Sequence, residues 1–226
     1  MSKIAKALSR AEEELGLEAG LGPGAADEAW FVGQAHGVRA ESAVAPARSA
    51  GGDGMRESVE VRYERTKVEQ ACFRKMEERR LLGENAPLEL RDAFNVVRTR
   101  ILQQTRAKGM NTIMVTSPGR GDGKPTVATN LAISIARDAS QTALLVDANL
   151  RWPGISCGLG MDTGPGLSDH VMSDVPLESL FVNPGIAKLV VLPAGATQED
   201  SLDVLSSPRM QRLVAEMKSR YPDRYV

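Results

Sequence analysis

The chain has 226 residues with a formal net charge of −1, and 42% of its residues are hydrophobic. This length and composition are ordinary for a globular protein and leave room for a sizeable core. The balanced charge argues against binding nucleic acid through overall basicity, and two cysteines are too few for a disulfide scaffold. No apolar run reaches the ~20 residues that span a bilayer, and the first residues lack the apolar core of a secretory signal. We therefore expect a soluble, cytoplasmic chain with no nucleic-acid partner.

The first part of the chain divides into three segments. Residues 1–16 have apolar positions spaced for a short helix, either a frayed end or a docking element for a partner. Residues 17–55 are rich in glycine and alanine without a sustained period, which predicts a flexible linker. Residues 56–84 are dense in charge, and we expect a solvated helical segment with its helix formers at 69–82.

A more strongly patterned helix is predicted over residues 89–107. Pro87 precedes it and Gly109 follows it, as is usual at helix ends. Its predicted inward stripe consists of Leu90, Phe94, Val97 and Ile101. One face of this helix should therefore pack on a core.

Strands and helices alternate in the second half of the chain. Short apolar runs predict strands at 112–115, 143–146 and 189–192. Because these runs are continuous rather than alternating, they suit a mostly parallel sheet that is covered on both faces by helices. The expected fold class is therefore α/β, in a domain over residues 85–226 that follows the helix and the linker.

Two helices are predicted between and after these strands. One runs from Lys124 to about Arg137, and the other begins at Pro208 with Ser207 as its cap. The residues predicted to face inward are Val127, Leu131 and Ile135 in the first, and Met210, Leu213, Val214 and Met217 in the second.

A glycine-rich segment over residues 115–126 lies between a predicted strand and a predicted helix. In that context glycines let backbone N–H groups converge on phosphate oxygens, the helix N-terminus adds positive potential, and a lysine reaches the outer phosphates. The residues expected to hold a nucleotide are Gly119, Gly121, Asp122, Gly123, Lys124 and Thr126. The alternative is an ordinary glycine-rich turn.

One position of this segment departs from the usual phosphate loop. The residue after the lysine is normally Ser or Thr, whose hydroxyl binds Mg²⁺. Here it is Pro125, which offers neither a hydroxyl nor a backbone N–H. Thr126 has a hydroxyl, but its direction from the helix differs by about 100°.

An acidic residue, Asp147, follows the predicted strand at 143–146. The carboxyl end of a strand beside a phosphate loop is a suitable place for an acid that holds Mg²⁺ or orients an attacking hydroxyl. The alternative is an aspartate that caps local backbone in a loop. The sequence leaves both interpretations open.

Together these motifs resemble the bacterial tyrosine autokinase family of exopolysaccharide and capsule biosynthesis, a family of phosphate-loop ATPases. The matching segments are the phosphate loop at 116–124 and the motifs at 130–132, 144–153, 166–169, 192–195 and 205–210. The stretch 92–99 resembles the helix through which these kinases assemble. The first residues resemble cytoplasmic members that pair with a separate membrane protein.

The resemblance implies ATP-dependent phosphorylation of tyrosines on neighbouring subunits, with Mg²⁺ as the metal. Lys124 would neutralise charge on the transferred phosphoryl group, Asp147 would bind the metal or orient the tyrosine, and Arg151 would help to shape the site. The implied partners are a membrane-embedded polysaccharide chain-length or export protein and further copies of the chain, assembled through the helix at 89–107. The chain would lie in the cytoplasm, or at the inner face of the membrane through that partner.

Several positions depart from the family pattern. Besides Pro125, Asn149 stands where the family usually has a second Asp, which removes a negative charge from the implied metal site. Arg120 occupies a position that is usually Pro, and Asn95 replaces the middle arginine of the assembly motif. The first two departures weaken the same implied Mg²⁺ site.

Residues 221–226 resemble the start of a third strand motif, with a strand beginning at Arg224, and the sequence ends before that motif's acid. We therefore expect a C-terminally truncated kinase with impaired catalysis. One alternative is a non-catalytic nucleotide-binding or scaffold module that regulates polysaccharide export. The other is a positioning or partitioning ATPase, which usually carries an extra lysine early in the loop, where this chain has Pro118 or Gly119.

Overall fold

The computed structural model describes residues 66–220 and 224–226, all within one compact unit, Asp53–Val226. The helix predicted at 1–16 and the linker predicted at 17–55 lie outside the described residues. No helix within the described ranges combines the length and the apolarity that crossing a membrane requires.

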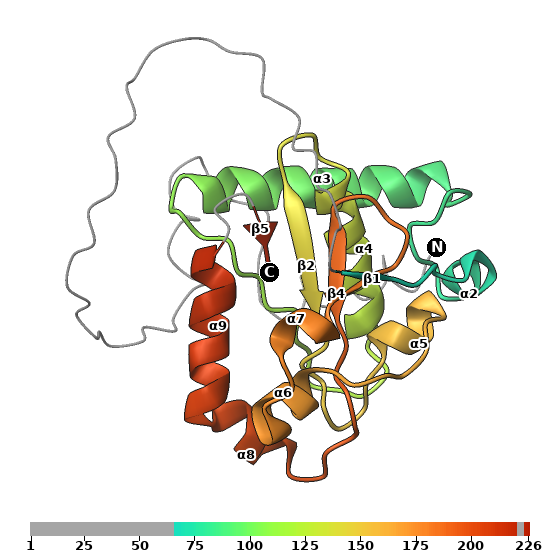
Figure 1. Ribbon diagram of the computed structural model, residues 1–226. Coiled ribbons are helices and arrows are strands. Elements are labelled where there is room, and N and C mark those ends of the chain that lie inside the picture. Colours follow the sequence, from blue (N-terminus) through green and yellow to red (C-terminus); the bar gives the residue numbers. More distant parts are fainter. Residues whose placement is uncertain (1–65, 221–223) are drawn as a thin grey trace. The chain divides into compact units, whose positions relative to one another are not determined.

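The described residues form a five-stranded sheet in the order β1-β3-β4-β2-β5 (Figure 1). Its strands are β1 (Lys67–Val68), β2 (Thr142–Val146), β3 (Val182–Asn183), β4 (Leu189–Leu192) and β5 (Arg224–Tyr225). β2 pairs in parallel with both β4 and β5, and β1 pairs in parallel with β3, whereas β3 and β4 are antiparallel. The expected mostly parallel sheet is confirmed, as are the strands predicted in its centre.

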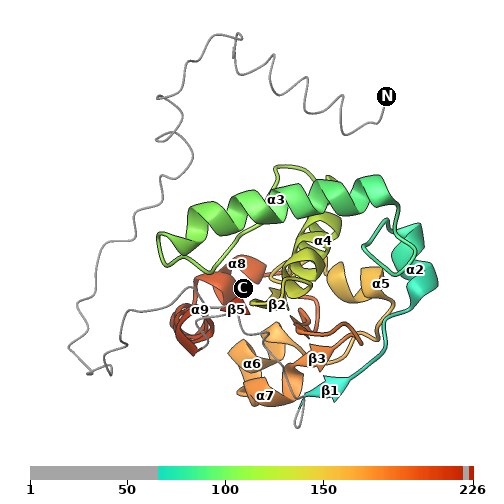
Figure 2. The same ribbon diagram turned by 90° about the horizontal axis from the view of Figure 1, so that it is seen from above.

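Helices cover both faces of this sheet, and Figure 2 shows α3 and α4 on one side with α6 and α7 on the other. Their bounds are α2 (Phe73–Glu78), α3 (Leu88–Arg106), α4 (Lys124–Ala136), α5 (Ile155–Leu159), α6 (Leu167–Ser173), α7 (Leu177–Leu180), α8 (Ser201–Ser206) and α9 (Pro208–Arg220). Successive residues of β2 alternate between two core clusters, with Ala143 and Leu145 in one and Leu144 in the other. A strand buried on both faces has no polar side to show, which explains its continuous apolar sequence.

Three valines that were predicted to face inward are exposed. Val97 of α3, Val127 of α4 and Val214 of α9 have exposed fractions of 42%, 44% and 38%. In α3 it is the next residue, Arg98, that faces α4. Its guanidinium donates a hydrogen bond to the backbone oxygen of Ser134 at 2.8 Å. The helices themselves begin and end close to the predicted residues.

The strand predicted at 112–115 is wrong, because these residues form no strand in the structure. Ile113 N within the segment donates to Val226 O, and Val226 N donates to the oxygen of Asn111 just before it, both at 2.8 Å. Met114 has 83% of its surface exposed. A strand forms only where a neighbouring strand pairs with it along its length. A local run of apolar residues does not reveal whether such a neighbour is present.

The charged segment after β1 is not the solvated helix that was expected over 69–82. Only Phe73–Glu78 are helical, and Met76, Leu81 and Leu82 are each buried, with exposed fractions of 3% or less. These apolar side chains belong to the core cluster on the α3 and α4 side of the sheet. Long-range packing therefore overrides the local charge pattern.

A buried amide fixes the turn that follows α2. Asn130 of α4 is 1% exposed, its Oδ1 accepts a hydrogen bond from the backbone N–H of Leu82 at 2.7 Å, and its Nδ2 donates to the backbone oxygen of Arg80 at 3.0 Å. Arg137, at the end of α4, also donates to the Leu82 oxygen at 2.9 Å. The turn is therefore held against α4 by side-chain to backbone hydrogen bonds.

We predict that Asn130→Ala lowers the free energy of unfolding by about 2–3 kcal/mol, because the change leaves the buried N–H of Leu82 and the half-buried carbonyl of Arg80 without their partner. Urea denaturation followed by circular dichroism measures the loss. Gln103→Ala, an exposed amide of α3, is the matched control and should change stability by less than about 0.5 kcal/mol. Equal effects of the two variants would contradict the buried clamp.

Candidate functional site

The glycine-rich loop leads directly into α4. Gly121 and Gly123 have φ values of 87° and 90°, in the left-handed region that glycine adopts without strain. Gly123 caps the helix, and Lys124 and Pro125 follow in its first turn. The predicted phosphate-loop geometry, a glycine-rich turn at a helix N-terminus, is therefore present.

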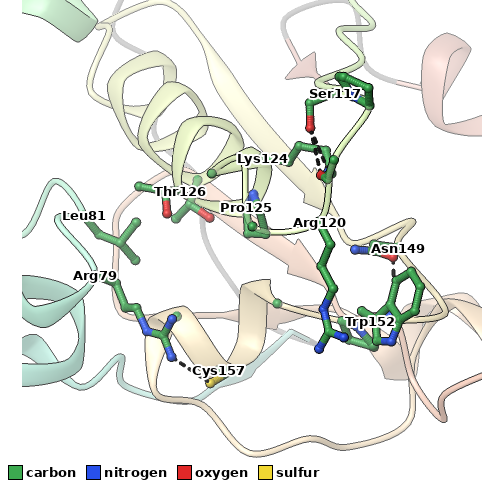
Figure 3. Close-up of a pocket in the computed structure, with 18 residues that line it drawn as sticks. Arg79, Leu81, Ser117, Arg120, Lys124, Pro125, Thr126, Asn149, Trp152 and Cys157 are labelled. Carbon is green, nitrogen blue, oxygen red and sulfur yellow. Dashed lines mark hydrogen bonds between the residues drawn. The ribbon is translucent and has the colours of Figure 1, made fainter. Parts of the chain in front are cut away.

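The Lys124 side chain lies inside the curve of this loop (Figure 3). Its Nζ donates hydrogen bonds to Ser117 Oγ at 2.7 Å and to the backbone oxygen of Gly119 at 2.6 Å. These neutral oxygens hold the ammonium at the loop without cancelling its charge. A phosphate oxygen arriving there would be a stronger acceptor than either of them.

The Asp122 carboxylate bends back onto the loop instead of facing the pocket. Its Oδ2 accepts a hydrogen bond from the backbone N–H of Gly119 at 2.8 Å. That bond, followed by the Ser117 hydroxyl and then the charge of Lys124, holds the pKa of Asp122 below its ordinary value. Asp122 therefore keeps its negative charge and shapes the loop.

A pocket of about 570 Å³ opens beside the loop, and three segments of the chain line it. They are the phosphate loop with the start of α4, the turn after α2, and the loop between β2 and α5. The lining residues are Arg79, Leu81, Ser117, Pro118, Gly119, Arg120, Gly121, Gly123, Lys124, Pro125, Thr126, Thr129, Asn149, Trp152, Pro153, Gly154, Cys157 and Gly158. Of the predicted site residues, five line the pocket, whereas Asp122, Asp147 and Arg151 do not.

Asp147 lies behind the pocket wall. It is 4% exposed, and its Oδ2 accepts hydrogen bonds from the backbone N–H groups of Gly154 at 2.9 Å and Ile155 at 3.0 Å. Its Oδ1 accepts a third from the N–H of Asn149 at 3.2 Å. The carboxylate therefore caps the start of α5 and fixes the loop before it, which is the capping alternative that the sequence left open.

Two arginines stack on one indole at the edge of the pocket. The guanidinium carbons of Arg120 and Arg151 lie 5.0 and 4.9 Å from the ring centroid of Trp152. Figure 3 shows Arg120 extending from the phosphate loop toward this ring. The stack joins the loop to the opposite wall through a cation–π contact, and Arg151, which does not line the pocket, contacts the same ring.

Sequence reasoning missed the wall formed by the end of α2. Arg79 and Leu81 line the pocket although they precede the phosphate loop by a long stretch of chain. The Arg79 guanidinium lies 4.0 Å from the thiol of Cys157, which is on α5 (Figure 3). No local pattern marks these residues, because the buried Asn130 hydrogen bonds bring them to the site.

The oxygen ligands that Mg²⁺ requires are not brought together here. The Pro125 ring fills the space beside α5, since a Cβ built on Gly154 would lie 2.9 Å from its Cγ. Asn149 Oδ1 accepts a hydrogen bond from the backbone N–H of Trp152 at 3.3 Å. The described residues contain no group of three or more His, Cys, Asp or Glu that would suit a metal ion. Phosphate fits the loop, and Mg²⁺ does not fit the residues beside it.

The fold and the loop define the chain as an α/β domain of the phosphate-loop class. No family model matches it. Its curated relatives include the tyrosine-protein kinase YwqD of Bacillus subtilis, 28% identical over 130 residues that cover 58% of this chain and 54% of the relative. The tyrosine-protein kinase CpsD of Streptococcus agalactiae is 28% identical over 128 residues, which cover 56% and 54%. The chain thus spans about half the length of the curated relatives it matches.

Solved structures agree with these relatives. The VpsO kinase domain is 29% identical, with a TM-score of 0.52 over 61% of this chain and 68% of that one. The kinase domain of the Escherichia coli tyrosine kinase ETK has a TM-score of 0.57 over 71% and 67%, and at 21% identity it supports the fold alone. The resemblance to bacterial tyrosine kinases that the motifs indicated is confirmed.

We predict that Asp147→Ala lowers the free energy of unfolding by about 2–4 kcal/mol, because one buried and two half-buried backbone donors lose their acceptor. Denaturant unfolding followed by tryptophan fluorescence measures the effect. Asp92→Ala, which removes an exposed carboxylate from α3, should cost about 0.5 kcal/mol or less. Unchanged or increased stability of the Asp147 variant would mean that the carboxylate is not the structural cap described above.

Proposed function

We propose that this chain binds ATP through its phosphate loop and is a tyrosine-kinase-like protein of polysaccharide biosynthesis or export in which phosphoryl transfer is slow. The observation that carries the proposal is the Lys124 ammonium, held inside a glycine-rich loop at the mouth of the pocket. The kinase names of the relatives support ATP as the ligand.

The loop glycines, Lys124 and Thr126 contact the phosphates in this proposal, and Asp147 acts from behind the pocket wall. Lys124 leaves Ser117 and Gly119 to bind the outer phosphates, and the loop glycines present their backbone N–H groups. Thr126 adds a hydroxyl at the helix start. Asp147 positions the opposite wall through its backbone hydrogen bonds.

Two features of the site support slow transfer. The residues beside the loop do not provide the ligands of Mg²⁺, which is the usual source of charge neutralisation in phosphoryl transfer. The described residues that line the pocket also include no carboxylate or imidazole that could accept the proton of a tyrosine hydroxyl. The proposal is therefore a protein that binds the nucleotide well and transfers its phosphoryl group poorly.

We predict that Lys124→Ala weakens ATP binding at least tenfold, because the variant removes a charge-assisted contact to the outer phosphates. Isothermal titration calorimetry on the full chain measures the affinity. Lys108→Ala, beyond the end of α3, is the control and should bind ATP as the native chain does. Affinity that Lys124→Ala leaves unchanged would rule out nucleotide binding through this loop.

A kinase assay tests the second half of the proposal. With labelled ATP, Mg²⁺ and a tyrosine polymer, turnover should fall far below the ~1–100 s⁻¹ of ordinary kinases. Turnover within that range would contradict the proposed impairment. Tight ATP binding with no transfer at all would favour the second candidate, a nucleotide-binding scaffold for a membrane-embedded export protein, which Pro125 and Asn149 support.

We also propose that copies of the chain associate through α3. Val96 and Val97 expose 53% and 42% of their surface on this helix, which supports an apolar contact there. Arg98 of the assembly motif, however, donates to the backbone of its own α4 and is less able to reach a neighbour.

Val97→Asp should shift a concentration-dependent oligomer toward the monomer, because it places a charge in that contact. Light scattering coupled to size exclusion measures the mass, and Gln104→Asp, an exposed change near the far end of α3, is the control. A native chain that is monomeric at every concentration would contradict assembly through this helix.

A further inference from the structure

We propose that the pocket binds the phosphate chain of its nucleotide as a metal-free anion, with Arg120 and Arg79 supplying the positive charge that Mg²⁺ supplies in other phosphate loops. The inference rests on the proposed nucleotide binding and names the form in which the nucleotide is held. It follows from the charges that line the pocket and from the misfit of the metal.

The charge that faces the pocket is entirely positive among the described residues. Arg79, Arg120 and Lys124 line it, and no carboxylate does. The two nearby acidic side chains form hydrogen bonds away from the pocket. Asp122 accepts from the backbone N–H of Gly119, and Asp147 accepts from the backbone N–H groups at the start of α5. Three cations facing one cavity favour a ligand with several negative charges.

The Arg120 guanidinium is already directed across the loop. Its place beside Trp152, at 5.0 Å from the ring centroid, orders a side chain that would otherwise lose rotamer freedom on binding. A planar guanidinium binds phosphate with two parallel hydrogen bonds. Arg120 therefore offers the loop a cation that needs no metal.

Arg79 approaches from the other wall of the pocket. Its guanidinium contacts the Cys157 thiol at 4.0 Å, and a thiol is a weak acceptor. Little is lost when this arginine turns to a phosphate oxygen instead. The two arginines come from segments far apart in the sequence, so a phosphate chain in the pocket would be held from two sides.

The same residues that weaken metal binding leave room for this arrangement. Pro125 places a hydrocarbon ring where a ligand hydroxyl would stand, and Asn149 adds no charge that would repel a phosphate. Mg²⁺ neutralises two charges of the ATP phosphate chain, so it weakens the attraction of three cations for that chain. Metal-free ATP should therefore bind at least as tightly as its Mg²⁺ complex.

The experiment is calorimetry of the full chain with ATP at constant ionic strength, first with a chelator and then with excess Mg²⁺, because screening depends on the salt. We expect excess Mg²⁺ to weaken binding about threefold to tenfold. Arg120→Gln should weaken metal-free binding about tenfold and abolish the preference for the free anion. Arg74→Gln, an exposed arginine of α2 that pairs with Glu78, is the matched control and should behave as the native chain.

Inorganic tripolyphosphate is the second probe, and it separates the two proposals. If ATP fails to bind but tripolyphosphate binds and Arg120→Gln weakens it, nucleotide binding is wrong and the metal-free anion site stands. If ATP binds the native chain more tightly with Mg²⁺ than with chelator, the metal-free site is wrong and nucleotide binding stands. If neither anion binds in chelator, this inference is overturned whatever Mg²⁺ does.

Discussion

The pocket depends on one buried carboxylate. Asp147 directly follows β2, and its own backbone N–H donates to the Leu192 oxygen of β4 at 3.0 Å, so the sheet fixes where the side chain begins. A carboxyl group that is 4% exposed requires hydrogen-bond partners. Three backbone N–H groups supply them, and all three belong to the loop and helix start that form one pocket wall. Asn149, Trp152 and the α5 start are therefore positioned by a side chain that does not itself line the pocket.

The opposite wall of the pocket is positioned by the neutral side-chain amide of Asn130, which also forms hydrogen bonds to backbone groups. Asn130 holds the turn after α2 against α4, and that turn carries Arg79 into the pocket. The phosphate loop joins the two walls, because it enters the same helix α4 from which Asn130 projects. Both walls are thus set by buried polar side chains that accept or donate to backbone, which fixes position more narrowly than apolar packing.

The sequence predicts the structure correctly where the relevant residues are close together in the chain. Glycine spacing with Lys124 predicts the loop, and continuous apolar runs predict β2 and β4. It does not predict features that depend on contacts between residues far apart in the chain. The run at 112–115 has the composition of a strand, but among the described residues its bonding to Val226 consists of the Ile113 N–H, with Asn111 O adding a second hydrogen bond just before the run. No sequence motif around Arg79 predicts that it lines the pocket. Nor could the sequence decide the role of Asp147, because its donors reach it only through the folded path of the loop.

The departures from the kinase-family pattern at Arg120, Pro125 and Asn149 act on the same part of the pocket. Losing a hydroxyl at Pro125 and a carboxylate at position 149 removes oxygen ligands, and Arg120 adds a cation at the same edge. Each alone would leave a mismatch: a metal site without ligands, or a guanidinium competing with Mg²⁺ for the same phosphate oxygens. In the proposed metal-free site, they together keep the pocket attractive to phosphate while changing the source of its positive charge. Reintroducing a hydroxyl at residue 125 would therefore not rebuild a metal site by itself, since Asp147 remains engaged behind the wall and Arg120 remains stacked on Trp152.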